Sequence, residues 1–197
     1  MRYDKGQKEA TRKRILEAAA MRFRRDGIES VGVASLMGEI GLTQGGFYNH
    51  FASKEDLARE VLVEALAATR ERLAETGVGA AKDGLEPFVN FYLRPQHRDH
   101  PENGCAAAAL AVEVGRGPDA IKTAFTVELR KTVALIGERL PKSMKPRQRR
   151  EAAQAIFASM MGTLVLARAV GDAALSDELL TAGRRAALAL ASPQSAS

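Results

Sequence analysis

Apolar residues recur at every third or fourth position through most of this chain, and this spacing is the strongest constraint on its fold. The clearest series is Ile121, Phe125, Leu129, Val133, Ile136 and Leu140. Such spacing places an apolar stripe along one side of a helix. No stretch keeps the two-residue alternation of a half-buried strand, and alanine, the best helix former, is the most frequent residue. The sequence therefore predicts an all-α fold.

Turn and cap residues divide the chain into separate helices. Gly27 is expected to end the first helix, and Gly41-Leu42-Thr43 forms a tight turn with Thr43 as the N-cap of the third. Ser53 and Asp56 have the spacing of a capping box at the fourth. The expected helices span 11–26, 33–40, 43–51, 54–76, 85–96, 103–115, 119–140, 146–171 and 174–191. A flexible break is expected at 77–84 and a polar tail at 192–197.

The basic charge is concentrated near the N-terminus. Residues 1–54 hold 10 Lys and Arg against 6 Asp and Glu, whereas residues 55–197 hold 19 against 18. A basic module on a nearly neutral body predicts a polyanionic partner for the module alone. A solvated basic tail is the alternative interpretation.

Several features predict a soluble cytoplasmic protein. The charged N-terminus lacks the apolar core of a signal peptide. The longest charge-free run, 152–167, is shorter than the roughly 20 residues of a membrane helix, so no membrane association is expected. A single cysteine cannot form an internal disulfide.

The helix, three-residue turn and helix around residue 42 have the arrangement that places a second helix in the major groove of DNA. Gly45 and Gly46 would destabilise that helix by roughly 1 kcal/mol each, but they let its backbone approach a groove wall. Tyr48, Asn49 and His50 supply hydrogen-bonding groups, and Lys54 follows at the position expected for a phosphate contact.

The segment DGIESVGVASLMGEIGLTQGGFYNHFASKEDL, residues 26–57, resembles the N-terminal signature of the TetR/AcrR family of bacterial transcriptional regulators. The resemblance implies a three-helix helix-turn-helix headpiece over 1–57 and a helical ligand-binding and dimerisation body over 58–197. It also implies a dimer whose third helix enters the major groove. The residues it would set against DNA are Thr43, Gln44, Gly45, Tyr48 and His50, with Tyr48, His50 and Lys54 chiefly on phosphates. Phe47 and Phe51 would be core.

The body carries a weaker resemblance to one branch of the family, through RDHPENGCAAAALAVEV at 98–114 and LVLARAVGDAALSDELL at 164–180. This resemblance implies an inducer-binding body without naming the inducer. The residues that could line an inducer cavity are Phe88, Phe91, Tyr92, Phe125, Phe157, Met160 and Met161, with plain core packing as the alternative. Their apolar character favours a hydrophobic or aromatic inducer. Glu113 and Arg168 are candidate polar contacts or members of a structural ion pair.

Cys105 follows Gly104 at the expected start of a helix, where the helix dipole stabilises a thiolate. Some members of the family with Gly-Cys at a similar place sense electrophiles or oxidants. A thiol-sensing repressor acting through Cys105 is therefore the alternative function, and Cys105 joins the candidate ligand-binding residues. A small buried hydrophobe is the competing interpretation.

His97 and His100 lie three residues apart, with Asp99, Glu102 and Cys105 nearby, a spacing that could ligate zinc. The flanking prolines and the polar surroundings favour a solvated loop between helices. No metal site is therefore predicted.

The helices at 146–171 and 174–191 carry Gly162, Gly171 and Gly183, which let helix axes approach closely. Paired with the same helices of a second copy, they predict a two-fold four-helix dimer interface. Packing within one chain is the alternative.

The sequence lacks GxSxG, P-loop and HExxH motifs, and GVGAAKDG at 77–84 lacks the third glycine of a dinucleotide fingerprint. An enzyme and a cofactor are therefore not predicted. A membrane-surface or partner-binding helical protein would explain the basic N-terminus but not the helix-turn-helix. The predicted function is a homodimeric repressor, released from a palindromic double-stranded DNA operator by a small hydrophobic inducer. The helix that begins at Lys54 is expected to transmit the conformational change from the body to the headpiece.

Overall fold

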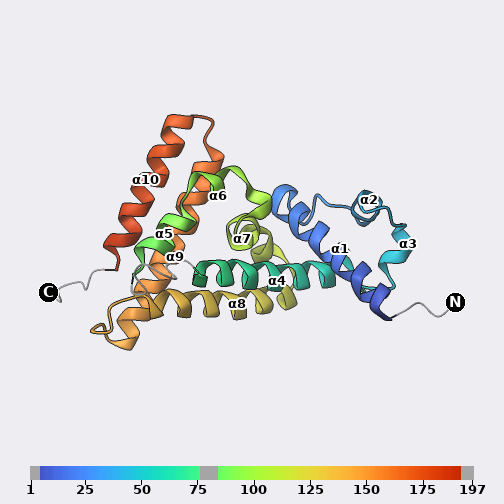
Figure 1. Ribbon diagram of the computed structural model, residues 1–197, viewed down its shortest axis with the longest axis horizontal. Helices are drawn as coiled ribbons and strands as arrows, with labels where there is room; N and C mark the ends of the chain where they lie inside the picture. The colour runs from blue at the N-terminus through green and yellow to red at the C-terminus, as the bar shows by residue number, and fades with distance from the viewer. Residues whose placement is uncertain (1–4, 76–83, 192–197) are drawn as a thin grey trace. The chain divides into compact units, whose positions relative to one another are not determined.

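The computed structural model describes residues 5–75 and 84–191 (Figure 1), and within these ranges it contains helices and no strand. The elements are α1 (Lys5–Asp26), α2 (Val33–Glu39), α3 (Gln44–Phe47), α4 (Lys54–Glu75), α5 (Glu86–Tyr92), α6 (Pro95–Asp99), η1 (Pro101–Asn103), α7 (Ala106–Arg116), α8 (Asp119–Glu138), α9 (Pro146–Ala169) and α10 (Ala173–Ala189). The all-α prediction is confirmed. The break expected at 77–84, apart from Gly84, and the tail at 192–197 lie outside the described residues.

Several helix boundaries differ from the prediction. The first helix, expected from about residue 11, begins at Lys5. The helix expected over 85–96 is split into α5 and α6, because a residue before proline avoids the helical region, and Arg94 has ψ 153° before Pro95. The helix expected over 103–115 begins only at Ala106, after the 3-10 turn η1. The third helix ends at Phe47, not at residue 51. Gly45 and Gly46 explain its shortness, since glycine loses the most backbone freedom in a helix.

The chain divides into two compact units. The first contains residues 1–66 and 101–126, and the second contains residues 67–100 and 127–197. α4 and α8 each pass from one unit into the other. The predicted border between a headpiece and a body, at 57/58, lies inside α4 and stays a prediction, because a compact unit need not coincide with a functional domain.

The first unit has an apolar core built from helix faces. Ile15, Ala19 and Phe23 are at most 1% exposed, as their i, i+4, i+8 spacing predicted. The rest of this core includes Leu36 and Met37 of α2, Phe47 of α3, Phe51 from the turn after it, Leu57 and Val61 of α4, and Leu110 and Val114 of α7, all buried. α1 packs against α2, η1 and α7.

In the second unit, α9 packs along α10 and requires glycine at one point. A Cβ atom on Gly183 of α10 would lie 2.3 Å from the Cγ2 and Oγ1 atoms of Thr163 on α9. The close approach that the glycines predicted therefore occurs within one chain at Gly183. At Gly162 and Gly171 a Cβ atom would meet nothing within 4 Å, so these two glycines do not serve that packing.

Polar contacts also stabilise the second unit. Arg98 of α6 donates to Ser176 Oγ at 3.0 Å and to Asp177 Oδ1 at 2.6 Å, both on α10. Glu128 of α8 is only 2% exposed. Its carboxylate accepts hydrogen bonds from Arg70 of α4 at 2.6 Å and from Lys131 at 2.5 Å.

One described helix, α9, is long and apolar enough to cross a membrane when judged by length and composition alone. The sequence analysis did not predict such a helix, because the charge-free run of 16 residues is too short to span a membrane. The core helix of a soluble protein passes the same test, and Ile156, Met160 and Leu164 of α9 are fully buried within the second unit. This helix is therefore weak evidence for a membrane span.

Candidate nucleic-acid interface

The turn between α2 and α3 has a specific helix-ending geometry. Gly41 has φ 72°, a conformation that glycine adopts without steric cost. Its N–H donates to the Gly38 carbonyl at 3.0 Å, and the Leu42 N–H donates to the Met37 carbonyl at 2.9 Å. These two bonds form a Schellman motif, which uses both amide groups that follow the helix. The predicted tight turn at this point is confirmed.

α3 is fixed by a cap at its start and by buried phenylalanines. Thr43 Oγ1 accepts a hydrogen bond from the Gly46 N–H at 3.4 Å, as predicted for an N-cap. After Phe47 the backbone continues in turns, with the His50 N–H donating to the Phe47 carbonyl at 2.9 Å. Phe47 and Phe51 are 0% and 2% exposed and stack with ring centroids 5.5 Å apart. Their predicted place in the core is confirmed.

The other side of α3 faces solvent. Thr43, Gln44, Gly45 and Asn49 are exposed, and Tyr48 is 61% exposed. A Cβ atom on Gly45 would meet nothing within 4 Å. The packing of the described chain therefore does not require glycine at position 45, although glycine lowers the stability of the helix. The exposed surface of this short helix is polar and has no bulky side chain at its centre, around Gly45. Such a surface suits close approach to another molecule.

His50 and Lys54 are only half-buried and differ from the other five candidates. His50 Nδ1 is buried and has no hydrogen-bond partner among the described residues. Burial lowers the pKa of His50, and the charges of Lys8 and Arg12 lower it further, so the environment favours the neutral ring. The ammonium group of Lys54 donates to the Glu29 carbonyl at 3.2 Å. Phosphate contacts by these two residues stay a prediction.

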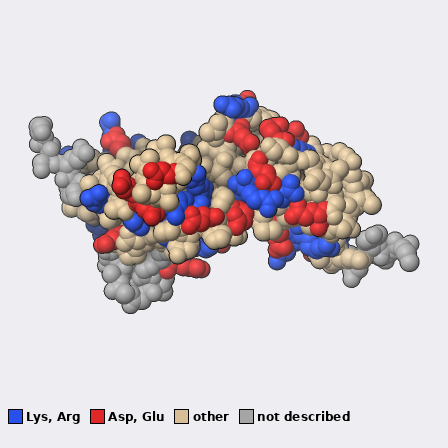
Figure 2. Space-filling model, turned by 90° about the horizontal axis from the view of Figure 1, so that it is seen from above, with Lys and Arg blue, Asp and Glu red and all other residues tan. Residues whose placement is uncertain are grey.

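Many of the basic side chains near the N-terminus are paired with carboxylates. The ion pairs join Arg12 with Glu60, Lys13 with Glu17, Arg22 with Asp26 and Glu39, Arg25 with Asp26, and Arg59 with Asp56. Hydrogen bonds from Arg25 and Arg22 lower the pKa of Asp26 to about 2. Figure 2 likewise shows acidic and basic side chains intermixed on the face that it presents. On that face the basic side chains therefore do not form one uninterrupted patch.

The predicted ligand-binding residues fall into both units. Phe88, Phe91, Tyr92, Phe157 and Met161 belong to the second unit, and Cys105 and Phe125 belong to the first. Of these, Phe88, Tyr92, Cys105 and Phe157 are buried, while Phe91, Phe125 and Met161 are half-buried.

Two of these aromatic residues contact each other, and two contact arginines. The Tyr92 and Phe157 rings meet edge to face with centroids 6.2 Å apart. The guanidinium carbon of Arg94 lies 3.8 Å from the centroid of the Phe91 ring, and that of Arg139 lies 5.5 Å from the Phe88 ring. The sequence reasoning missed both arginines, because no local spacing connects them with these rings.

Glu113 and Arg168 each bond to the main chain within their own unit. Glu113 Oε2 accepts a hydrogen bond from the Ile28 N–H at 2.7 Å. Arg168 donates to the carbonyl oxygens of His97 and Arg98. These contacts give both side chains a structural role.

His97 is held in a structural environment as well. Its Nδ1 lies 2.6 Å from the Tyr92 carbonyl oxygen, and its ring meets that of Tyr92 edge to face. Burial lowers the pKa of His97 to about 4 despite the hydrogen bond to Tyr92, which raises it. Among the described residues, no group of three or more His, Cys, Asp or Glu side chains could hold a metal ion.

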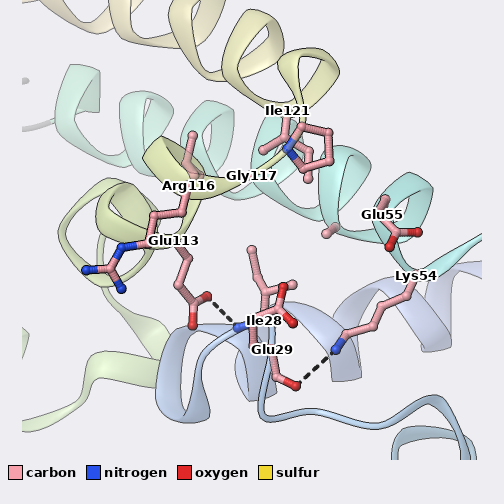
Figure 3. A pocket seen from close by; sticks show the side chains of 11 residues that line it. Ile28, Glu29, Lys54, Glu55, Glu113, Arg116, Gly117 and Ile121 are labelled. Atoms are coloured by element: carbon pink, nitrogen blue, oxygen red, sulfur yellow. Dashed lines mark hydrogen bonds between the residues drawn. The ribbon is translucent and has the colours of Figure 1, made fainter.

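The sequence reasoning did not predict a pocket of about 280 Å³ in the first unit (Figure 3). It is lined by Ile28, Glu29, Lys54, Glu55, Ala58, Glu113, Val114, Arg116, Gly117, Pro118 and Ile121. These residues come from the turn after α1, from α4 and α7, from the connection between α7 and α8, and from the start of α8. Only folding brings them together, so no sequence motif could have indicated the pocket.

The structure therefore defines a helix-turn-helix protein with a polar, exposed second helix. Residues 15–61 match the family model described as bacterial regulatory proteins, tetR family. A stretch of 88 residues is 31% identical to the probable HTH-type transcriptional regulator ArpR of Pseudomonas putida, and it spans 45% of this chain but only 40% of that relative. The N-terminal segment at residues 15–61 is therefore that of the bacterial regulatory proteins of the tetR family.

Solved structures of other proteins share the fold. The reduced form of E. coli NemR is similar with a TM-score of 0.74 at 20% identity, over 90% of this chain and 95% of that one. A TetR transcriptional regulator from Chloroflexus aurantiacus is similar with a TM-score of 0.74 at 23% identity, over 91% and 95% of the two chains. At these identities the likeness concerns the fold alone.

Proposed function

We propose that this protein is a homodimeric transcriptional repressor that binds a palindromic operator through α3 and is released by a small molecule. The observation that carries the proposal is the two-sided character of α3. Phe47 and Phe51 anchor it, while Thr43, Gln44, Gly45, Tyr48 and Asn49 remain exposed and polar or small. A short helix anchored in this way can present side chains and its own backbone to base edges and phosphates.

The proposed inducer is hydrophobic or aromatic. This part of the proposal is supported by the aromatic side chains of the second unit, of which Tyr92 and Phe157 already contact each other. Inducer and operator would each weaken the binding of the other by the same factor, typically about 5- to 150-fold. α4 is proposed to transmit the conformational change, because it begins next to the helix-turn-helix and continues into the second unit.

Fluorescence anisotropy with labelled DNA tests the central claim. The purified protein is titrated against DNA from upstream of its own gene and against scrambled DNA of the same composition, over a series of salt concentrations. We expect tight binding to the first DNA alone, with an affinity that falls as salt rises. If both DNAs are bound equally and the binding is salt-labile, the titration is repeated with DNA selected from a random pool. Equal binding of the selected and the scrambled DNA would contradict a sequence-specific regulator.

The proposed dimer interface is the exposed side of α9 and α10. On α9 an apolar stripe without a covering element in the described chain recurs at helical spacing, in Ala155, Ala158, Gly162, Val165, Leu166 and Ala169. Leu166 is 55% exposed, and Leu175 at the start of α10 is 43% exposed. Open space at Gly162 would let a partner helix approach closely, and two copies would make an isologous four-helix contact.

Leu166→Glu is expected to convert the dimer into a monomer. The substitution places two charges in the proposed interface, and losses above about 2 kcal/mol are typical at the centre of such contacts, which corresponds to about 30-fold in dissociation constant. Light scattering coupled to size-exclusion chromatography measures the mass. Val112→Glu is the control, because Val112 is 66% exposed on α7 and lies off this surface. A Leu166→Glu variant that remains dimeric would place the interface elsewhere.

A thiol sensor acting through Cys105 is the alternative function, and it has less support. Cys105 lies at the N-cap of α7, as predicted, and the fold resembles that of reduced NemR. However, Cys105 is only 1% exposed. A thiolate must be accessible to react quickly, so sensing would require α7 to open first.

A further inference from the structure

α1 and α2 both end at a glycine with positive φ, but the two ends differ in how their amide groups are used. At α2 the Schellman motif uses the N–H groups of Gly41 and Leu42. At α1 the Gly27 N–H donates to the Phe23 carbonyl at 2.9 Å. This is the αL motif, in which a single hydrogen bond ends the helix. That ending provides no acceptor from α1 for the next amide, the Ile28 N–H.

Glu113 of α7 supplies the missing acceptor. Its Oε2 atom lies 2.7 Å from the Ile28 nitrogen (Figure 3). Its Oε1 atom occupies the space beside Gly27, where a Cβ atom would lie 2.5 Å away. The Glu113 carboxylate therefore replaces both the missing helix acceptor and the missing side chain at residue 27. Such a fit depends on one placement of α7 against the end of α1.

Two further bonds hold the same stretch of chain. Arg24 Nε donates to the Glu102 carbonyl of η1 at 2.6 Å. Lys54 Nζ donates to the Glu29 carbonyl from the start of α4. The last turn of α1 is thus bonded to η1, and the turn that leads into α2 is bonded to α7 and to α4. The segment 101–126, which carries Glu113, continues into the second unit at both of its ends.

We propose that Glu113 is a positioning residue for the helix-turn-helix. It fixes the turn at Gly27 and Ile28, and through this turn the placement of α2 and α3 relative to α7. This inference rests on the proposed function, since its consequence is read from DNA. In a dimer, the placement of each α3 sets the separation of the half-sites that can be bound together. Loss of the Glu113 contact is expected to relax the requirement for one half-site spacing.

The test uses the full-length protein and the operator found by selection from random DNA, together with versions in which the half-site spacing is changed by one base pair. One base pair shifts a half-site by about 3.4 Å and rotates it by about 35°. The ratio of affinities for the original and altered spacings is measured for the wild type and each variant. A merely structural role would lower thermal stability without changing this ratio.

Glu113→Ala is expected to lower the spacing ratio at least about 5-fold, the low end of typical coupling factors. Glu113→Gln should stay within about 2-fold of the wild type, because its amide oxygen can still accept the Ile28 N–H. Val112→Ala, on the exposed side of the same helix, is the matched control. If Glu113→Ala does not fold, Glu113→Asp replaces it, since the shorter side chain keeps the charge but cannot reach Ile28 from the same backbone position.

An unchanged spacing ratio in Glu113→Ala or Glu113→Asp would overturn the proposal, and so would a Glu113→Gln variant that behaves like Glu113→Ala. These results require a wild type that binds its operator. Failure of the wild type to bind any selected DNA would instead refute the proposed function, and the positioning role would fall with it. The two failures are therefore distinguished by the wild-type titration alone.

Discussion

Tyr48→Ala should lower operator affinity by at least about 30-fold while leaving the fold intact. The ring is 61% exposed at the C-cap of α3, at the position proposed for a phosphate contact, and in a dimer its loss counts twice. A contact to DNA is worth about 1–3 kcal/mol. Among the described residues, Tyr48 makes an edge-to-face contact with Phe47, with ring centroids 5.3 Å apart, and the loss of this contact costs about 1 kcal/mol. Anisotropy titration and urea unfolding followed by circular dichroism measure the two effects separately.

Two substitutions make the Tyr48 result specific. Tyr48→Phe keeps the ring and removes the hydroxyl group, so an intermediate loss of affinity in this variant would be assigned to a hydrogen bond with DNA, and the further loss in Tyr48→Ala to the ring. Met21→Ala alters an exposed apolar side chain on α1, which is 46% exposed, and should leave operator affinity within about 2-fold of the wild type because it removes no polar contact. Unfolding of Tyr48→Ala, or unchanged affinity, would show that Tyr48 is structural or lies off the DNA.

The helix-turn-helix could be predicted from sequence because its signals are local. The predictions of a turn at Gly41 and a cap at Thr43 depend on residues fewer than five positions away, whereas the prediction of Phe47 as core came from the family resemblance. The structure confirms all three. The predicted α3 is longer than the observed helix. Its two consecutive glycines were taken to lower the stability of the helix, but not to shorten it.

The rest of the site could not be predicted because it depends on contacts between residues far apart in the chain. Glu113 was considered only as a ligand contact or an ion-pair partner, although its acceptor role requires the end of α1, 85 positions away. The split between α5 and α6 is the exception. Pro95 was visible in the sequence, and its effect on Arg94 could have been used to end the first of these helices.

Glu128→Ala is expected to destabilise the protein by about 3–5 kcal/mol, the usual cost of removing one partner from a buried ion pair. Glu128 is 2% exposed, and it holds Arg70 of α4 and Lys131 of α8. Alanine would leave the Arg70 guanidinium, whose side chain is 21% exposed, without this carboxylate. Urea unfolding at one fixed protein concentration measures the change.

Matched variants distinguish the effect of breaking the buried ion pair from the effect of removing any carboxylate. Glu151→Ala removes an exposed carboxylate that pairs with Arg147 on α9, and it should change stability by less than about 1 kcal/mol. The double variant Arg70→Met with Glu128→Leu removes both charges and should lose less than the two single variants together. Equal losses in Glu128→Ala and Glu151→Ala would contradict a special role for burial.

The pH dependence gives an independent test of Glu128. Burial raises the pKa of its carboxyl group, but hydrogen bonds from Lys131 and Arg70 outweigh burial, so the pKa lies below its ordinary value. A lowered pKa in the folded state means that the ionised pair stabilises the protein above the unfolded value of about 4.3. This stabilisation is lost as the pH falls through the folded value. The stability difference between wild type and Glu128→Ala should therefore be constant from pH 7 to about pH 5 and narrow below about pH 4. A difference that widens in acid would mean that Glu128 is protonated in the folded protein, and that burial outweighs its two cationic partners.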